Sequence, residues 1–137
     1  MPLDLALRLA AVPRFNGRTG PEGREAIAFA ADMRRRMIEG ARSMGPWCHI
    51  PNEGRRSRIA AAKLRAEGMI SGMPDYILPA PGSLMIELKA TTKQTEAQLD
   101  VEAWASLFGI NYRVARSAAE AIKIVDRWQE WPFRMPL

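Results

Sequence analysis

Two short apolar segments joined by a tight turn constrain the fold of this chain more than any other feature. The segments are residues 75–79 and 84–89, and the turn between them is Pro-Ala-Pro-Gly. Such a pair, separated by a proline- and glycine-rich turn, predicts a β-hairpin. Asp75 begins the first segment, and the second contains Glu87 and Lys89. Because side chains alternate along a strand, Glu87 and Lys89 project from the same face.

Two carboxylates and an ammonium group would then meet at one end of a small sheet. Carboxylates on neighbouring strands repel each other, and a bound cation is a common reason for such a pair. Mg²⁺ needs few protein oxygens, so Asp75, Glu87 and the backbone carbonyl of Leu88 would suffice to hold it. Lys89 could orient or deprotonate a water, or neutralise charge on a scissile phosphate. The spacing therefore predicts a metal-dependent nuclease.

The composition limits the classes to which this protein can belong. Its 137 residues fit one domain with one compact core. Lys and Arg number 20 against 15 Asp and Glu, and the net charge of +5 favours a polyanionic partner. The single Cys48 and the single histidine exclude an intramolecular disulfide and make a Cys/His zinc site implausible. No apolar run is long enough for a membrane span, so we expect a cytoplasmic protein.

Turn and cap residues divide the chain into alternating helices and strands. Thr19-Gly20-Pro21-Glu22 is typical of a helix start, and two later capping boxes begin at Thr95 and Ser117. The predicted order is helix 21–39, strand 47–50, helix 55–67, strands 75–79 and 84–89, helix 96–108, strand 110–115 and helix 118–131. This order predicts an α/β fold with a small mixed sheet covered by helices. Residues 1–20 are predicted to form an N-terminal arm, 21–131 the domain and 132–137 a tail.

Apolar periodicity predicts which helix faces are buried. Helix 96–108 carries an apolar stripe that we expect in the core, formed by Ala97, Val101, Trp104 and Phe108. His49 lies in a strand-like apolar run, and we predict a buried core histidine rather than a member of the site. In the first helix, Glu22 lies roughly 40° from the centre of the apolar stripe and Glu25 roughly 100° away. Glu22 therefore points toward the core side of its helix end.

The helix at residues 55–67 is strongly basic. Arg55, Arg58 and Arg65 fall on one of its faces, and Arg56 and Lys63 on another. A basic helix directly before the strand that begins with Asp75 suits a surface that follows DNA phosphates. We therefore expect DNA contacts from Arg55, Arg56, Arg58 and Lys63. An ordinary solvated face is the simpler alternative.

The chain resembles a known family, the VRR-NUC domain of the PD-(D/E)xK nuclease superfamily. The similarity covers about residues 21–128 and rests on the order and spacing of four motifs: Ile50 to Ser57, Gly68-x-x-x-Gly72-x-Pro74-Asp75, Ile86-Glu87-Leu88-Lys89, and Thr95-x-x-Gln98 at a helix start. The first of these is similar to a segment of small stand-alone bacteriophage and bacterial members. The resemblance therefore implies the cytoplasm of a bacterial or phage-infected host cell.

This resemblance implies a restriction-endonuclease-like fold and hydrolysis of DNA phosphodiester bonds with Mg²⁺ or Mn²⁺. By position, Asp75 and Glu87 match the metal-binding acids, Lys89 the catalytic lysine and Gln98 a glutamine that supports the site. Glu22 matches a further acid on the first helix, with Glu25 as the fallback, and Asn52 is a candidate for substrate contact on resemblance alone. Stand-alone members are expected to act as homodimers on branched DNA such as Holliday junctions.

Several alternatives remain open at the level of sequence. Taken singly, Asp75 is typical of a turn, and Glu87 with Lys89 of a solvated pair on an exposed strand. Gln98 would cap its own helix whether or not it serves a site. The substrate could be a flap, a nick or plain duplex, and a DNA-binding module that does not cut could have the same scaffold.

Overall fold

The computed structural model describes residues 2–12, 15–39, 45–51 and 56–130. Its elements, in chain order, are α1 (Leu3–Ala10), α2 (Pro21–Ile38), β1 (Cys48–His49), α3 (Arg58–Ala66), β2 (Tyr76–Leu78), β3 (Leu84–Leu88), α4 (Glu96–Leu107), β4 (Asn111–Ala115) and α5 (Ala118–Glu130). The predicted order of helices and strands is thus present, with boundaries shifted by a few residues. α3 begins at Arg58 because the Ser57 side chain accepts the Ala60 N–H and caps the helix.

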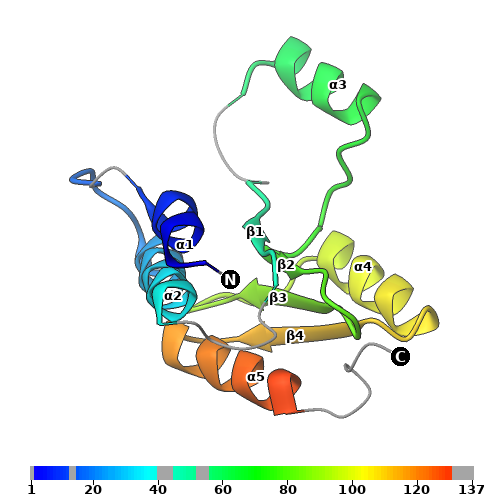
Figure 1. The fold of residues 1–137 in the computed structure, drawn as a ribbon. Coiled ribbons are helices and arrows are strands. Elements are labelled where there is room, and N and C mark those ends of the chain that lie inside the picture. Colours follow the sequence, from blue (N-terminus) through cyan, green and yellow to red (C-terminus); the bar gives the residue numbers. More distant parts are fainter. Residues whose placement is uncertain (1, 13–14, 40–44, 52–55, 131–137) are drawn as a thin grey trace.

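One four-stranded mixed sheet organises the protein, in the order β1-β2-β3-β4. β2 and β3 form the predicted antiparallel hairpin, in which Tyr76 pairs with Ile86. β4 runs parallel to β3, and α4 is the connection between them (Figure 1). A parallel pair requires such a crossover because the chain must return to the same end of the sheet.

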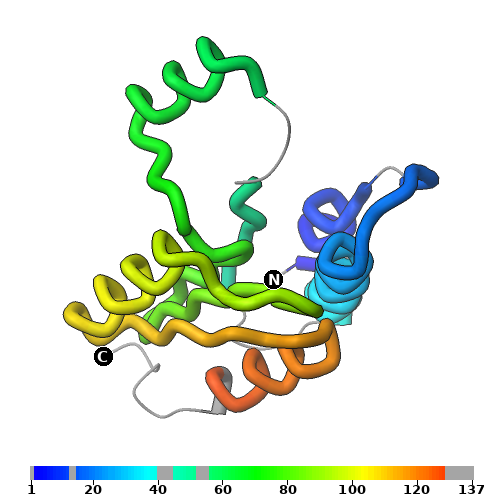
Figure 2. Tube along the Cα trace, turned by 180° about the vertical axis from the view of Figure 1, so that it is seen from behind, coloured from blue at the N-terminus to red at the C-terminus, as the bar shows by residue number. Residues whose placement is uncertain are grey.

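Helices cover the two faces of this sheet unequally. α2 and α5 pack on one face over the main core, which includes Phe29, Met33, Leu78 and Val125. α4 covers the other face with a smaller cluster around Val101, Ala105 and Tyr112. Figure 2 shows α4 and α5 on opposite sides of the strands. The unequal cover leaves part of the α4 face open.

Two predictions of burial are wrong. Trp104 is 50% exposed and Phe108 is 72% exposed, although both were expected in the core. Within α4 only Val101 and Ala105 are buried, and they pack with Tyr112 of β4. His49 is also exposed, because β1 has only two residues and lies at the edge of the sheet.

Two helices lie outside the sheet layers. α1 packs against α2 through Ala6 and Ala10, which are buried. α3 stands away from the sheet, on the excursion of the chain between β1 and β2 (Figure 1), and none of its residues is buried. Among the described residues, no helix combines the length and apolar character needed to cross a membrane.

Candidate active site

Glu87 and Lys89 occupy the end of β3 and are almost completely buried, with 2% and 6% of their surfaces exposed. Ile86 and Leu88 point into the main core, so the alternation of the strand turns the two charged side chains toward α4. Lys89 Nζ lies 3.6 Å from Glu87 Oε1. The solvated surface pair suggested by the sequence is therefore excluded.

The carboxyl group of Glu87 is held in an unfavourable electrostatic position. Burial raises its pKa to about 8, the negative charge of Asp75 adds to this rise, and the ammonium group of Lys89 opposes it. One of its oxygens, Oε2, is buried and has no hydrogen-bond partner within the described part of the chain. A buried oxygen without a partner is costly unless a ligand completes it.

The β2–β3 hairpin places Asp75 beside Glu87 and Leu88. Its Oδ2 accepts a hydrogen bond from the Leu88 N–H at 2.6 Å, which joins the start of β2 to the end of β3. Gly72 positions the approach to Asp75, because a Cβ there would lie 2.3 Å from the Ala97 carbonyl carbon. The glycine also has φ +85°, a conformation that other residues rarely adopt. The loop before Asp75 thus lies directly against the first turn of α4.

Gln98 performs both functions that the sequence left as alternatives. Its Oε1 accepts the Thr95 N–H at 2.8 Å, while the Thr95 hydroxyl accepts the Gln98 N–H, which completes a capping box. Its Nε2 donates to Glu87 Oε1 at 2.6 Å. One amide therefore caps α4 and orients the buried carboxyl group of β3.

We expect Gln98→Glu to keep the cap but damage the site. A carboxylate can still accept the Thr95 N–H, but it cannot donate to Glu87 and adds a second negative charge beside it. Cleavage should fall by about 10-fold or more, a loss on the order of 1–2 kcal/mol of transition-state stabilisation. Single-turnover kinetics and thermal unfolding would test this expectation. Full activity with unchanged stability would show that Gln98 is only a cap.

The structure separates the two acids of α2. Glu22 accepts a hydrogen bond from the Thr92 hydroxyl at 2.8 Å and lines a cavity of about 150 Å³ together with Asp75 and Leu88. Glu25 instead accepts the Ala118 N–H at 2.7 Å and so caps the start of α5. The acid of α2 that faces Asp75 is thus Glu22, the one that the helical spacing favoured.

These different positions predict opposite effects of substitution. Glu25→Ala should lower the free energy of unfolding by about 1 kcal/mol, because the Ala118 N–H at the start of α5 loses its acceptor while Ser117 still caps the Glu120 N–H, and it should leave the cleavage rate per folded molecule unchanged. Glu22→Ala should leave the stability nearly unchanged and reduce cleavage. Denaturant unfolding and cleavage assays on both variants provide the comparison. If Glu25→Ala is the more harmful to catalysis, this assignment of the two acids is wrong.

Two further residues lie at the site that were not among its predicted members. His49 lines the same cavity as Glu22, and its Nδ1 lies 2.9 Å from the Asp75 carbonyl oxygen. Since a carbonyl oxygen only accepts, Nδ1 carries the hydrogen and Nε2 is the other ring nitrogen available to a ligand. Arg116 donates to the carbonyl oxygens of Lys89 at 3.0 Å and Thr92 at 2.7 Å, which holds the loop after β3 in place.

Only the tertiary structure reveals these two residues. Arg116 follows β4 and belongs to none of the motifs, and His49 directly precedes the motif Ile50 to Ser57 but lies in an edge strand outside it. Their partners are mainly backbone carbonyls, which leave no pattern of side-chain types to recognise. A histidine just before the segment Ile50 to Ser57 was the only available indication.

The donor atoms fit a hard divalent cation without forming a complete cage. Within the described residues, no group of three His, Cys, Asp or Glu side chains converges closely enough to hold a metal ion. Mg²⁺ commonly takes one or two carboxylates and keeps several waters. Asp75 and Glu87, with the Leu88 carbonyl, match that requirement, and the unpartnered Oε2 of Glu87 is an oxygen that such an ion would satisfy.

Three of the five predicted DNA-binding residues lie within the described part of the chain. Asn52 and Arg55 fall outside the described residues. Arg56 donates to the Pro51 carbonyl oxygen at 2.9 Å, and Lys63 pairs with Glu67 at 2.6 Å. Arg58 is exposed at the first turn of α3. Among the described residues, Arg58 and Lys63 thus lie on the projecting α3, whereas Arg56 precedes α3 and is bonded to Pro51, which lines the same cavity as Asp75.

Comparison with known proteins identifies the fold. The sequence matches no known family model and no curated protein. A solved structure described as a VRR_NUC domain protein aligns with a TM-score of 0.52 and 20% sequence identity, over 93% of this chain and 84% of that chain. At this identity the similarity shows the fold. The chain therefore has the mixed α/β fold of a VRR_NUC domain, which confirms the fold class predicted from the motifs.

Proposed function

We propose that this protein is a divalent-metal-dependent endonuclease that hydrolyses phosphodiester bonds in DNA. The observation that carries the proposal is the burial of Glu87 and Lys89 side by side, with Asp75 bonded to the intervening Leu88. Burying charged groups costs free energy, and sites that pay this cost are often functional. The VRR_NUC fold supports the same conclusion.

Asp75, Glu87 and the Leu88 carbonyl would hold Mg²⁺ or Mn²⁺, and Glu22 lines the cavity beside Asp75 and Leu88. When bound, the cation would polarise the phosphate and lower the pKa of a coordinated water. Gln98 orients Glu87, and the hydrogen bond from Leu88 orients Asp75. Arg116 keeps the loop with Thr92 against the site, so the Thr92 hydroxyl can hold Glu22.

Lys89 is the residue that we propose as the catalytic lysine. Its ammonium group is buried beside Glu87, where water screens charge weakly. There the Lys89 nitrogen would hold the attacking water, deprotonate it as the neutral amine, or, as the ammonium ion, neutralise charge that develops on the phosphate. Each role requires the terminal nitrogen and not only the length of the side chain.

The substrate we propose is branched DNA such as a Holliday junction. The net charge of +5 and the exposed Arg58 and Lys63 of the projecting α3 support DNA as the partner. We propose that Arg56 also contacts DNA, as do Asn52 and Arg55, which fall outside the described residues. We also propose that the protein acts as a homodimer. Two active sites related by a twofold axis could face two strands of a symmetric junction.

A substrate panel tests this function directly. Labelled junction, flap, nicked and linear DNAs are incubated with the purified protein and Mg²⁺ or Mn²⁺, with Asp75→Asn as the matched inactive control. We expect metal-dependent cutting, fastest on the junction, and retained DNA binding by the control. Preference for another DNA would correct the substrate only. If every DNA stays whole while salt-sensitive binding persists, the protein is a DNA-binding module without nuclease activity.

A further inference from the structure

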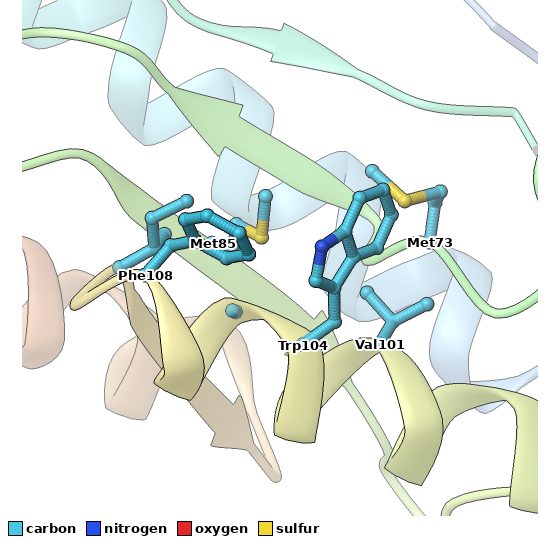
Figure 3. A pocket seen from close by; sticks show the side chains of 7 residues that line it. Met73, Met85, Val101, Trp104 and Phe108 are labelled. Atoms are coloured by element: carbon cyan, nitrogen blue, oxygen red, sulfur yellow. The ribbon is translucent and has the colours of Figure 1, made fainter.

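The open part of the α4 face contains an apolar groove of about 300 Å³. It lies between α4 and the strands, and its lining consists of Met73, Met85, Val101, Trp104, Ala105, Phe108 and Ile110. Figure 3 shows Trp104 and Phe108 rising from α4 toward the two methionines. Leu107, beside Trp104 on α4, is 82% exposed. Exposed apolar surface of this kind commonly marks a site of protein interaction.

The charged residues of α4, the helix that forms one wall of this groove, are all acidic. α4 carries Glu96, Asp100 and Glu102 and no basic residue. Asp100 lies next to Trp104 on the helix surface, at roughly 40° around the axis. An acidic rim repels DNA phosphates, so nucleic acid is a poor occupant of the groove. The rim favours a segment that is apolar on one side and basic beside it.

The chain itself contains such a segment in α3. Ile59 is 83% exposed, and α3 packs on none of the sheet layers. At about 100° per residue, Ile59, Ala62 and Ala66 share one side of this helix, and Arg65 lies beside Ala62. Ala61 and Leu64, the half-buried residues of α3, point to the opposite side. The side of α3 that faces solvent therefore combines the large apolar Ile59 with two small alanines, and Arg65 lies beside it.

We propose that α3 of one copy of this protein docks in the α4 groove of a second copy, reciprocally. Ile59 would enter the groove near Trp104 and Phe108, and Ala62 and Ala66 would let the two helices approach closely. Arg65 would face Asp100. Reciprocal exchange makes the same two surfaces meet twice around a twofold axis. The proposal specifies the interface of the homodimer and does not depend on whether the protein cleaves DNA.

This docking leaves two of the proposed DNA-contacting residues outside the contact. Arg58 directly precedes Ile59, lies about 100° from it around the helix and is at the other end of α3 from Arg65, and Arg56 precedes α3. Lys63 lies about 40° from Ile59, at the edge of the docking side, so it would stand beside the acidic rim of the groove. The dimer would therefore hold α3 in one position with Arg56 and Arg58 exposed to solvent.

The molar mass in solution tests the proposal. We expect the wild type to sediment as a dimer of the 15.3 kDa chain. Ile59→Asp and Trp104→Asp should each raise the dimer dissociation constant by at least about 10-fold, because each puts a charge into an apolar contact. Phe108→Asp, at a lining residue that is 72% exposed, replaces Trp104→Asp if that variant does not fold. Leu3→Asp, a change at an exposed leucine of α1, should leave the dimer intact.

Two combinations of substitutions distinguish this interface from other possible dimer interfaces. An equimolar mixture of Ile59→Asp and Trp104→Asp chains should form more dimer than either variant alone, since one of its two contacts is intact. Arg65→Glu should weaken the dimer, and Asp100→Lys in the same chain should restore it. A monomeric wild type, including one whose own α3 closes the groove, would overturn the proposal. So would a dimer that Ile59→Asp and the groove variant leave unchanged.

Discussion

Lys89→Met is expected to lower the rate of DNA cleavage by about 10²–10⁴-fold, the range attributed to a positioned acid–base group. Methionine keeps most of the volume of the buried side chain but removes the ammonium group 3.6 Å from Glu87. The loss should appear in the single-turnover rate constant at saturating protein. The DNA dissociation constant should stay within about twofold, because Lys89 is buried away from the basic residues of α3.

A matched control makes this result specific. Lys123 is an exposed lysine on α5, and Lys123→Met removes the same charge far from the end of β3. Its cleavage rate should equal that of the wild type. Equal activity of Lys89→Met and Lys123→Met would contradict the role of Lys89. A parallel loss of DNA binding in Lys89→Met would instead mean that the buried ammonium group contacts substrate in the ground state.

Glu87→Gln is expected to stabilise the metal-free protein at neutral and alkaline pH. The folded state raises the pKa of Glu87 from its ordinary 4.5 to about 8, mainly because the group is buried and Asp75 is close. Between these two values the folded protein keeps a proton that the unfolded chain has lost. Stability from this group is therefore full below the lower value and falls as pH rises through the upper one. The slope is at most about 1.4 kcal/mol per pH unit.

Thermal unfolding measured from acid to alkaline pH in the presence of a chelator tests this expectation. The wild type should lose stability through this window, while Glu87→Gln should lose less, since its amide oxygen can still accept from Gln98. Added Mg²⁺ or Mn²⁺ should raise the melting temperature of the wild type, because an ion that binds the folded state stabilises it. Identical pH and metal responses of both proteins would contradict the placement of Glu87 in a metal site.

The local sequence was sufficient for the hairpin and for the charges on it. A Pro-Ala-Pro-Gly turn between two short apolar segments has few structural alternatives, and it places Asp75 beside Leu88 whatever the rest of the chain does. The capping box at Thr95 likewise marks the start of α4. These features depend on neighbours within a few residues, so the sequence contains the information needed to predict them.

The local sequence was not sufficient to predict both contacts of Gln98. Its cap is local, but its bond to Glu87 depends on how closely α4 approaches β3. Gly72 permits that approach, because any larger residue would collide with the backbone of Ala97. A sequence shows that a glycine is present, but only the packed structure shows what it lies against.

The sequence by itself thus determined the α/β order, the β2–β3 hairpin and the alternation that puts Glu87 and Lys89 on one face. Only the tertiary structure decided that both charges are buried, that Glu22 faces the cavity while Glu25 caps α5, and that Trp104 stays at the surface. The reason is physical. Helical and strand periodicity sets the direction of a side chain about its own axis, whereas burial depends on what packs opposite, and that partner comes from a distant part of the chain.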